Sequence, residues 1–451
     1  MRNRRDLTPD FSMVRGRRLL IALSGGADSV ALAALLSDAR ASYGLELSAV
    51  HVDHAIRPES AEDAEFCRDL CASLDIPFHL ERVDVPALAK AHRRGLETEA
   101  RIQRYQILHR LREETGAELI ALAHHMDDQA EAVLMHLARG AGPQGICGMR
   151  ALDQEAGLYR PLLPYRKAEL VDYLRARGLT WREDATNTLD DNPRNALRLH
   201  AIPELEKCYP QFTRAVARFA ASAQIESDFL AGLTRDYLRR SFFAPPGWCC
   251  RWLDLTVLPP RAVLRRALME ASGCDTLTHE QVNALEALCS KLRGRLDLSP
   301  DLMAERTGHR LYFARKNVEP IAPVPLNLNG ATLCPPLCAI EAAPSPPIPV
   351  RNDPWRQVLN RDALRGAVVR TRLPGDRIRP LGCGEKLLSD YFTDRKIDRP
   401  LRDQVALVAV GSRVHWVTGF DISQEAAVIP GDIAVSLTYS DDIIRRKNHA
   451  K

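Results

Sequence analysis

A six-residue segment, Ser24-Gly-Gly-Ala-Asp-Ser29, constrains the fold of this chain more than any other. The apolar run from Arg18 to Leu23 before it has the length of a buried strand, and residues 30–36 after it predict an apolar helix face. Two glycines between a strand and a helix let the backbone approach a bound group and point amide N–H groups at it. Because a helix N-terminus is also partially positive, the segment suits a phosphate.

The polar residues of the segment refine this interpretation. Ser24 and Ser29 supply hydroxyl donors, whereas Asp28 would repel an anion unless a divalent metal ion bridges the two. The alternative is an ordinary strand-to-helix turn in which serine and aspartate cap the helix. No lysine follows the glycines, so the segment is not the GxxxxGK[ST] loop of phosphoryl-transfer enzymes.

The first part of the chain alternates between predicted strands and helices. Beyond the glycine segment, we predict strands over 47–52, 78–83 and 118–123, and helices over 61–74, 96–112 and 128–137. This alternation implies an α/β fold with a doubly wound parallel sheet. Ligands of such sheets bind at the carboxyl ends of the strands, where Ser24 to Ser29, His51 to His54 and His124 to Asp128 are all expected.

The rest of the chain has a different pattern. Residues from about 203 to 315 are mostly helical in pattern, most clearly at 261–271 and 279–293, and ten prolines gather between 320 and 354. Strands are predicted over 367–372 and 405–410. The sequence therefore predicts four segments: a doubly wound α/β domain over 1–215, a helical middle domain over 216–318, a proline-rich linker over 319–354 and a small mixed α+β domain over 355–451.

Composition limits the class of protein and its surroundings. The 451 residues are 45% hydrophobic and 27% charged, which is typical of a soluble globular protein, and no apolar run is long enough to span a membrane. A net charge of +4 means that a nucleic-acid surface must be a local patch. Eleven cysteines include no C-x-x-C pair, which argues against a zinc ribbon or an iron–sulfur cluster and favours a reducing cytoplasm.

A second informative segment runs from His124 to Glu131. Asp128 and Glu131 are three residues apart and therefore share a helix face. They could simply be acids that favour a helix N-terminus, or they could form a metal site with the two neighbouring histidines. Similarly, Glu97 and Arg101 could pair with each other, or the arginine could bind phosphate.

Residues 140–145 match G-x-G-x-x-G, but they follow a predicted helix, not a strand. A helix C-cap is therefore favoured there over a dinucleotide site.

Several motifs occur in one order along the chain. SGGADS resembles the SGGxDS loop of the PP-loop ATP pyrophosphatases, and the complete series resembles the tRNA(Ile)-lysidine synthetases within that family. The series consists of SGGADS (24–29), HVDHAIR (51–57), LETEAR (96–101), HHMDDQAE (124–131), RGAGPQGICGM (139–149), WREDATN (181–187) and PRNALR (193–198). The resemblance is dense to about residue 205 and returns over 374–378 and 386–408, which resemble the C-terminal tRNA-binding domain of that family.

The resemblance implies a specific reaction. Enzymes of this family attach L-lysine to C2 of the wobble cytidine in a minor isoleucine tRNA with a CAU anticodon. ATP first adenylates the cytosine O2, and a lysine amine then displaces AMP, so that lysidine, AMP and pyrophosphate are formed. The implied partners are therefore tRNA(Ile), L-lysine, ATP and Mg²⁺, and the chain could form a homodimer.

The resemblance also implies roles for individual residues. It implies that Asp28 binds Mg²⁺ and that Arg101 and Arg198 neutralise the phosphate charge that develops in the transition state. It also implies that Asp128 and Glu131 bind the cationic lysine. The residues implied to bind the ATP phosphates are Ser24, Gly25, Gly26, Ala27, Asp28 and Ser29.

Eleven basic against seven acidic residues between 361 and 403 indicate, together with the resemblance, contact with tRNA phosphates.

Two alternatives remain. A PP-loop tRNA sulfur transferase would usually carry catalytic cysteines or a C-x-x-C cluster motif, which this chain lacks. A catalytically inactive tRNA-binding relative would have no reason to keep Asp28, Arg101, Asp128 and Glu131, whose charges are costly to desolvate.

Overall fold

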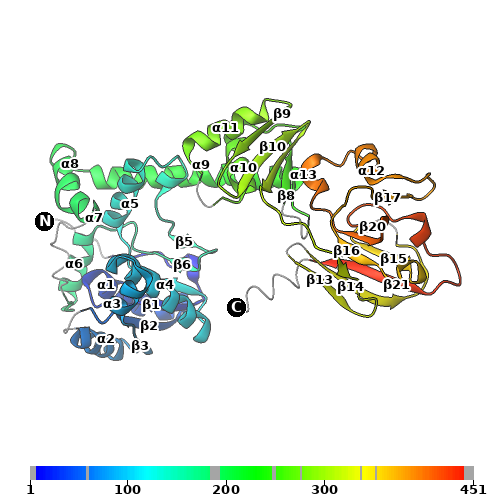
Figure 1. The fold of residues 1–451 in the computed structure, drawn as a ribbon. Coiled ribbons are helices and arrows are strands. Elements are labelled where there is room, and N and C mark those ends of the chain that lie inside the picture. Colours follow the sequence, from blue (N-terminus) through cyan, green and yellow to red (C-terminus); the bar gives the residue numbers. More distant parts are fainter. Residues whose placement is uncertain are drawn as a thin grey trace. The chain divides into compact units, whose positions relative to one another are not determined.

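The computed structural model describes residues 7–56, 60–182, 193–245, 250–274, 277–335, 338–350 and 353–440. The chain forms two compact units, Met1–Phe229 and Leu230–Lys451, so the boundary falls inside the long helix α9 (Phe212–Ser241) (Figure 1). None of the helices in the described ranges has the length and hydropathy needed to cross a membrane.

The first unit is built on a six-stranded sheet with the order β3-β2-β1-β4-β6-β5. Its strands are β1 (Arg18–Ala22), β2 (Glu46–Asp53), β3 (Phe78–Arg82), β4 (Leu119–Ala121), β5 (Leu152–Asp153) and β6 (Leu158–Tyr159). All neighbouring pairs are parallel except β5 with β6 at one edge. The predicted doubly wound parallel sheet is confirmed.

The strand order determines where a ligand can bind. From β1 the chain moves outward through β2 to β3, and it then returns to the other side of β1 to form β4. The order therefore reverses between β1 and β4. In open α/β sheets the crevice at this reversal, outside the carboxyl ends of the strands, is the usual binding site. The glycine segment follows β1, and the segment from His124 follows β4.

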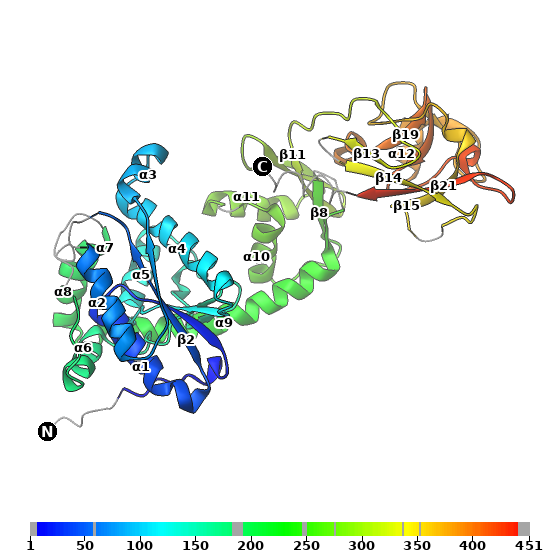
Figure 2. The ribbon, with the colours of Figure 1, turned by 90° about the horizontal axis from the view of Figure 1, so that it is seen from below.

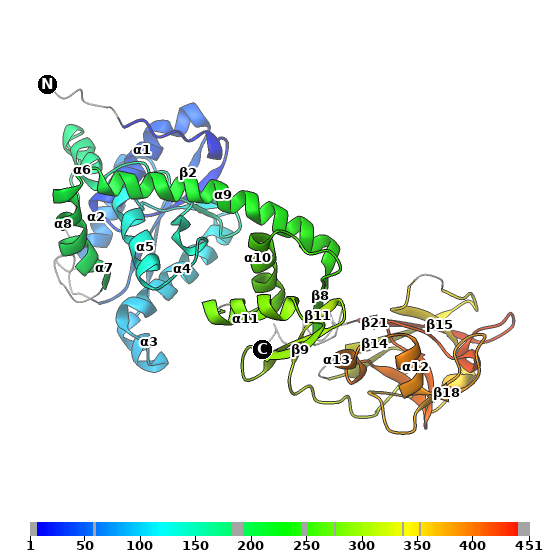
Figure 3. The same ribbon diagram turned by 90° about the horizontal axis from the view of Figure 1, so that it is seen from above.

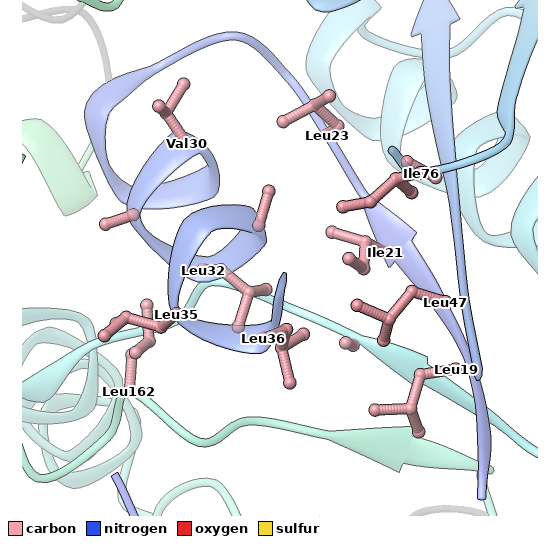
Figure 4. Close-up of a cluster of buried hydrophobic side chains, with 14 of the residues drawn as sticks. Leu19, Ile21, Leu23, Val30, Leu32, Leu35, Leu36, Leu47, Ile76 and Leu162 are labelled. Carbon is pink, nitrogen blue, oxygen red and sulfur yellow. The ribbon is translucent and has the colours of Figure 1, made fainter. Parts of the chain in front are cut away.

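Helices cover both faces of this sheet (Figure 2). The helices of the unit that precede α9 are α1 (Ala27–Tyr43), α2 (Ser60–Ser73), α3 (Val85–His92), α4 (Leu96–Glu114), α5 (Met126–Ala138), α6 (Lys167–Ala176), α7 (Pro193–Ala196) and α8 (Ile202–Cys208), with short turns η1 (Ser12–Val14) and η2 (Gly145–Cys147). Alternate residues of a strand point to opposite faces, so β1 contributes to two cores. Leu19 and Ile21 pack with Leu32 of α1, as Figure 4 shows, and Leu20 packs with Leu108 of α4. This packing fixes the start of α1 at the edge of the sheet.

The second unit begins with helices and an antiparallel sheet (Figure 3). Its helices are α10 (Arg261–Ser272) and α11 (His279–Cys289), and its strands, in the order β7-β8-β11-β10-β9, are β7 (Phe242–Phe243), β8 (Cys250–Asp254), β9 (Arg293–Asp297), β10 (Leu302–Thr307) and β11 (Arg310–Arg315). The predicted helices are present, but α11 ends at Cys289 and not at 293, because the chain from Arg293 pairs with β10. The sheet itself was not predicted from the helical pattern.

Two further sheets complete the second unit. One has the order β12-β16-β19-β20-β17-β18, and the other β13-β14-β21-β15. Their strands are β12 (Val324–Pro325), β13 (Ala331–Cys334), β14 (Cys338–Ser345), β15 (Arg356–Asn360), β16 (Val368–Arg370), β17 (Arg377–Ile378), β18 (Lys386–Leu387), β19 (Leu407–Val410), β20 (Arg413–Val417) and β21 (Ala434–Ser440), accompanied by α12 (Leu388–Asp394), α13 (Arg399–Arg402), η5 (Asp362–Leu364) and η6 (Gln424–Ala426). Strands β16 and β19 lie where strands were predicted.

The structure corrects the prediction of a linker over 319–354. In this segment β14 pairs with β21 from Ala339 to Ser345, and Cys334 and Ile340 are fully buried. The prolines are compatible with strands because they occupy permissive positions. Pro325 lies in the edge strand β12, and Pro344 lies beyond the part of β14 that pairs with β13. A high proline content therefore marks sheet edges here.

Tyr312 of β11 and Tyr391 of α12 belong to one buried cluster, which explains why the middle and C-terminal segments form a single unit.

Candidate functional site

The glycine segment is shaped by its own backbone and hydroxyl groups. Gly25 has a φ of +85°, which a residue with a side chain rarely adopts. The Ser29 hydroxyl donates to the Gly26 carbonyl at 2.9 Å and accepts from the Ser24 amide at 3.2 Å. Gly26 is the N-cap residue of α1 and no side chain caps this end. The first amide groups of α1 therefore have no side-chain acceptor, and a phosphate could serve as one.

Asp28 lies in the first turn of α1 and has one satisfied and one unsatisfied oxygen. Its Oδ2 lies 3.6 Å from His125 Nε2 and 3.6 Å from Lys167 Nζ. Its Oδ1 is buried and has no hydrogen-bond partner. Burial acts to raise the pKa of Asp28, but the hydrogen bond and charge of His125 and the charge of Lys167 hold it below its usual value. Asp28 is therefore ionised.

These features fit a magnesium ion at Asp28. Mg²⁺ is usually held by one or two carboxylates together with substrate phosphates and water. The unpaired Oδ1 beside a phosphate-compatible loop supplies such a carboxylate. No group of three or more His, Cys, Asp or Glu side chains in the described ranges could hold a metal ion by itself.

His125 connects the start of α1 to the start of α5. Its Nε2 faces Asp28, and its Nδ1 lies 3.4 Å from Asp127 Oδ2. Burial would lower the pKa of His125, but hydrogen bonds to Asp127 and Asp28, assisted by the charge of Asp128, raise it to about 9. His125 therefore lies between Asp28 and Asp127 and orients both carboxylates.

Asp128 and Glu131 of α5 face two arginines. Arg194 Nε lies 2.6 Å from Glu131 Oε2, and Arg194 Nη2 lies 2.6 Å from Asp128 Oδ1. Arg198 Nε lies 2.6 Å from Glu131 Oε1, and Arg198 Nη2 lies 3.5 Å from Asp128 Oδ1. Glu131 is completely buried, so it requires such partners. The predicted acid pair therefore lies on one face of α5, and its oxygens contact two guanidinium groups.

Arg198 contacts the acid pair in this structure, and its role at the phosphates stays a prediction. Arg194 was not among the predicted site residues, although its spacing of four from Arg198 on a helical segment could have revealed it. Arg198 lies in a π-helical turn, η4 (Leu197–Ala201), between α7 and α8. Such turns are frequent at functional sites.

Arg101 lies near this group but does not pair with the acids. Its guanidinium carbon is 5.1 Å from the centre of the Tyr105 ring, and the side chain is exposed. Burial, and then the charges of Arg160, Arg194 and Arg101, lower the pKa of His124 to about 4. Arg101 is therefore close enough for its charge to act on His124.

Two other motifs have structural contacts with the glycine segment. The His51 ring contacts the Leu23 carbonyl through Nδ1 at 2.9 Å. The Arg182 amide donates to the Gly25 carbonyl at 2.9 Å, and its guanidinium pairs with Asp63. Most of the WREDATN motif, the end of HVDHAIR and residue 192 lie outside the described residues.

Comparison with known proteins agrees with this geometry. A family profile described as a PP-loop domain matches residues 2–205, and one described as the TilS substrate C-terminal domain matches residues 367–438. The chain is 32% identical over 445 residues to the tRNA(Ile)-lysidine synthase of Geobacter sulfurreducens, covering 94% of this chain and 93% of that one. It is 35% identical over 434 residues to the tRNA(Ile)-lysidine synthase of Symbiobacterium thermophilum, covering 90% of each.

The parallel sheet, the glycine loop at its reversal point and the ionised Asp28 define a PP-loop nucleotide-binding domain. Family profiles match both this domain and the C-terminal domain, and two relatives match the chain over nearly their whole length. These matches identify the family within the PP-loop class. The chain belongs to the tRNA(Ile)-lysidine synthase family, whose members are ligases.

Proposed function

We propose that this chain joins L-lysine to C2 of the wobble cytidine in a tRNA(Ile) with a CAU anticodon, and that it uses ATP and Mg²⁺. One feature of the site carries the proposal: the start of α1 and the acid pair on α5 are coupled through His125. In this proposal, the site for a phosphate-bound cation lies beside the site for an organic cation. An enzyme that brings ATP and an amine to one acceptor needs this arrangement.

ATP supplies the activating group, since adenylation of the cytosine O2 turns a poor leaving group into AMP. The residues proposed to hold its phosphates are Ser24 to Ser29, with Asp28 on the metal ion. Positive charge near the phosphates would come from Arg101 and from Arg198 once Arg198 leaves the acid pair. Lysine then attacks C2, and lysidine, AMP and pyrophosphate are the products.

The contacts of the acid pair support its proposed role in binding lysine. Asp128 and Glu131 hold two guanidinium groups, so their surroundings already favour cations. A lysine ammonium group would replace one or both of them. The displaced Arg194 and Arg198 would then be available for phosphate or for the lysine carboxylate. Lysine and ATP should therefore bind cooperatively.

Three buried cysteines of the first unit are poorly suited to sulfur transfer. Burial raises the pKa of Cys67 to about 12 and that of Cys71 to about 11. Both thiols are therefore protonated and unreactive at neutral pH. Cys147 is also buried, and its thiol donates to the Pro143 carbonyl at 3.1 Å.

The C-terminal unit offers a smaller basic surface than the residue count suggested. Arg370 is buried in an ion pair with Asp376, so it stabilises the fold and cannot reach a phosphate. Several other basic residues pair with acids, namely Arg365, Arg372, Arg377, Lys386 and Arg395. The proposed tRNA contacts are therefore exposed Arg379, Lys396 and Arg399.

Pyrophosphate exchange tests the proposal. Because the acceptor of AMP is the cytosine, labelled pyrophosphate should enter ATP when tRNA and Mg²⁺ are present without lysine. A tRNA with uridine at the wobble position should suppress the exchange. Exchange that requires lysine and proceeds without tRNA would mean that lysine is the group adenylated, and it would overturn the mechanism.

A further inference from the structure

Lys167 is a basic residue that the sequence motifs did not select. It is the first residue of α6, and its amide donates to Asp127 Oδ2 at 2.8 Å. The preceding residue, Arg166, donates through Nε to Asp127 Oδ1, also at 2.8 Å. Asp127 thereby fastens the start of α6 to the start of α5, and the Lys167 side chain reaches Asp28 with Nζ 3.6 Å from Oδ2.

A metal ion at Asp28 would change the surroundings of this ammonium group. A divalent cation held by Asp28 together with the Lys167 ammonium group would place three positive charges on one carboxylate. Like charges so close repel strongly in a partly buried site. One of the groups must therefore give way when Mg²⁺ binds.

His125 cannot move, because only 3% of it is exposed and it also contacts Asp127 and Asp128. Lys167 can move, because its side chain is 49% exposed and has a flexible stem. The nearest new anion is the phosphate that the same metal ion would bridge. A lysine ammonium group is a common phosphate ligand.

We propose that Lys167 is a phosphate-binding residue for ATP, which exchanges Asp28 for a substrate phosphate when Mg²⁺ occupies the carboxylate. The inference rests on the proposed function, because it requires the ATP phosphates to lie at the glycine segment. It adds a residue from α6 to a site otherwise built from α1, α5 and the segment 193–201.

The alternative is that Lys167 only neutralises Asp28, and the two roles predict different effects of removing the charge. Lys167→Met keeps the apolar stem and the amide that binds Asp127. If Lys167 binds phosphate, the variant should bind a non-hydrolysable ATP analogue about 10- to 100-fold more weakly, the range expected for one charged hydrogen bond. If Lys167 only competes with the metal ion, the variant should bind the analogue as tightly as the wild type and need less Mg²⁺.

The experiment is calorimetric titration of the full-length protein with the analogue at several Mg²⁺ concentrations. Lys167→Arg keeps the charge and should restore most of the affinity, and Lys207→Met, at an exposed lysine paired with Glu204 in the same unit, should bind like the wild type. Unchanged affinity in Lys167→Met, or a Lys167→Arg protein no better than it, would overturn the inference. Failure of the wild type to bind the analogue would refute the proposed ATP site instead.

Discussion

Replacing Glu131 with glutamine isolates the charge of the acid pair. Both Glu131 oxygens contact arginines, and glutamine has nearly the same shape. Asp128 is a less suitable position, because its Oδ2 also accepts the His125 amide at 3.0 Å and so caps α5. Glu131→Gln therefore removes one negative charge from the proposed lysine site and leaves the helix start intact.

The structure allows the size of two effects to be worked out. Removing one partner of a buried ion pair costs about 3–5 kcal/mol. However, the Arg194 and Arg198 side chains are 34% and 32% exposed and can turn toward water, so we expect the free energy of unfolding to fall by about 1–2 kcal/mol. Loss of one charged hydrogen bond to lysine costs about 1.5–3 kcal/mol, so the KM for lysine should rise about 10- to 100-fold.

The assay is incorporation of labelled lysine into a tRNA(Ile) transcript, with lysine varied at saturating ATP and then ATP varied at saturating lysine. Denaturant unfolding of the same preparation measures the change in stability. The KM for ATP should change little. If the KM for ATP rises and that for lysine does not, the acids serve the metal ion or the nucleotide, and the lysine site lies elsewhere.

Three further outcomes are expected. Asp28→Asn should fold normally but lose about 100-fold or more in turnover, because the metal ion loses its anionic ligand; turnover near that of the wild type would refute the metal role. Replacing Lys396 and Arg399 with alanine should weaken tRNA binding and reduce the slope of log affinity against log salt by about 0.7–0.9 for each phosphate that is no longer neutralised. The control variant Arg370→Met should lower the stability of the protein instead. An unchanged salt slope in the double variant would mean that tRNA binds elsewhere. The pKa of His124 is lowered to about 4 in the folded protein. Between about pH 6.5 and 4, His124 therefore binds a proton in the unfolded chain but not in the folded protein. The free energy of unfolding should decrease as the pH falls through that range. This decrease should be smaller in His124→Gln by denaturant unfolding at pH 5 and 7, and an equal decrease in both proteins would contradict the assignment.

The sequence by itself determined the features that depend on local physical chemistry. The length of the run before Ser24, the two glycines and the helical period after them fixed a strand, a turn and a helix, and β1 and α1 lie where they were predicted. The spacing of Asp128 and Glu131 likewise placed both acids on one face of α5. The motifs and their order were sufficient to indicate the family.

Tertiary structure decided the features that depend on partners elsewhere in the chain. The segment from Arg293 became β9 because β10 could pair with it, and the proline-rich residues became β14 and β13 because β14 could pair with β21 and β13 with β14. Neither pairing can be predicted from the local sequence, since a strand partner in another segment does not alter the hydrophobic pattern of the strand itself.

Contacts between distant segments also explain which charged groups meet in the candidate site. The fold brings Arg198 to the buried Glu131, whose charge must be compensated. Lys167 reaches Asp28 only because β4 returns beside β1 and Asp127 holds α6 next to α5. The sequence supplied the charged groups, and only the strand order decided which of them meet.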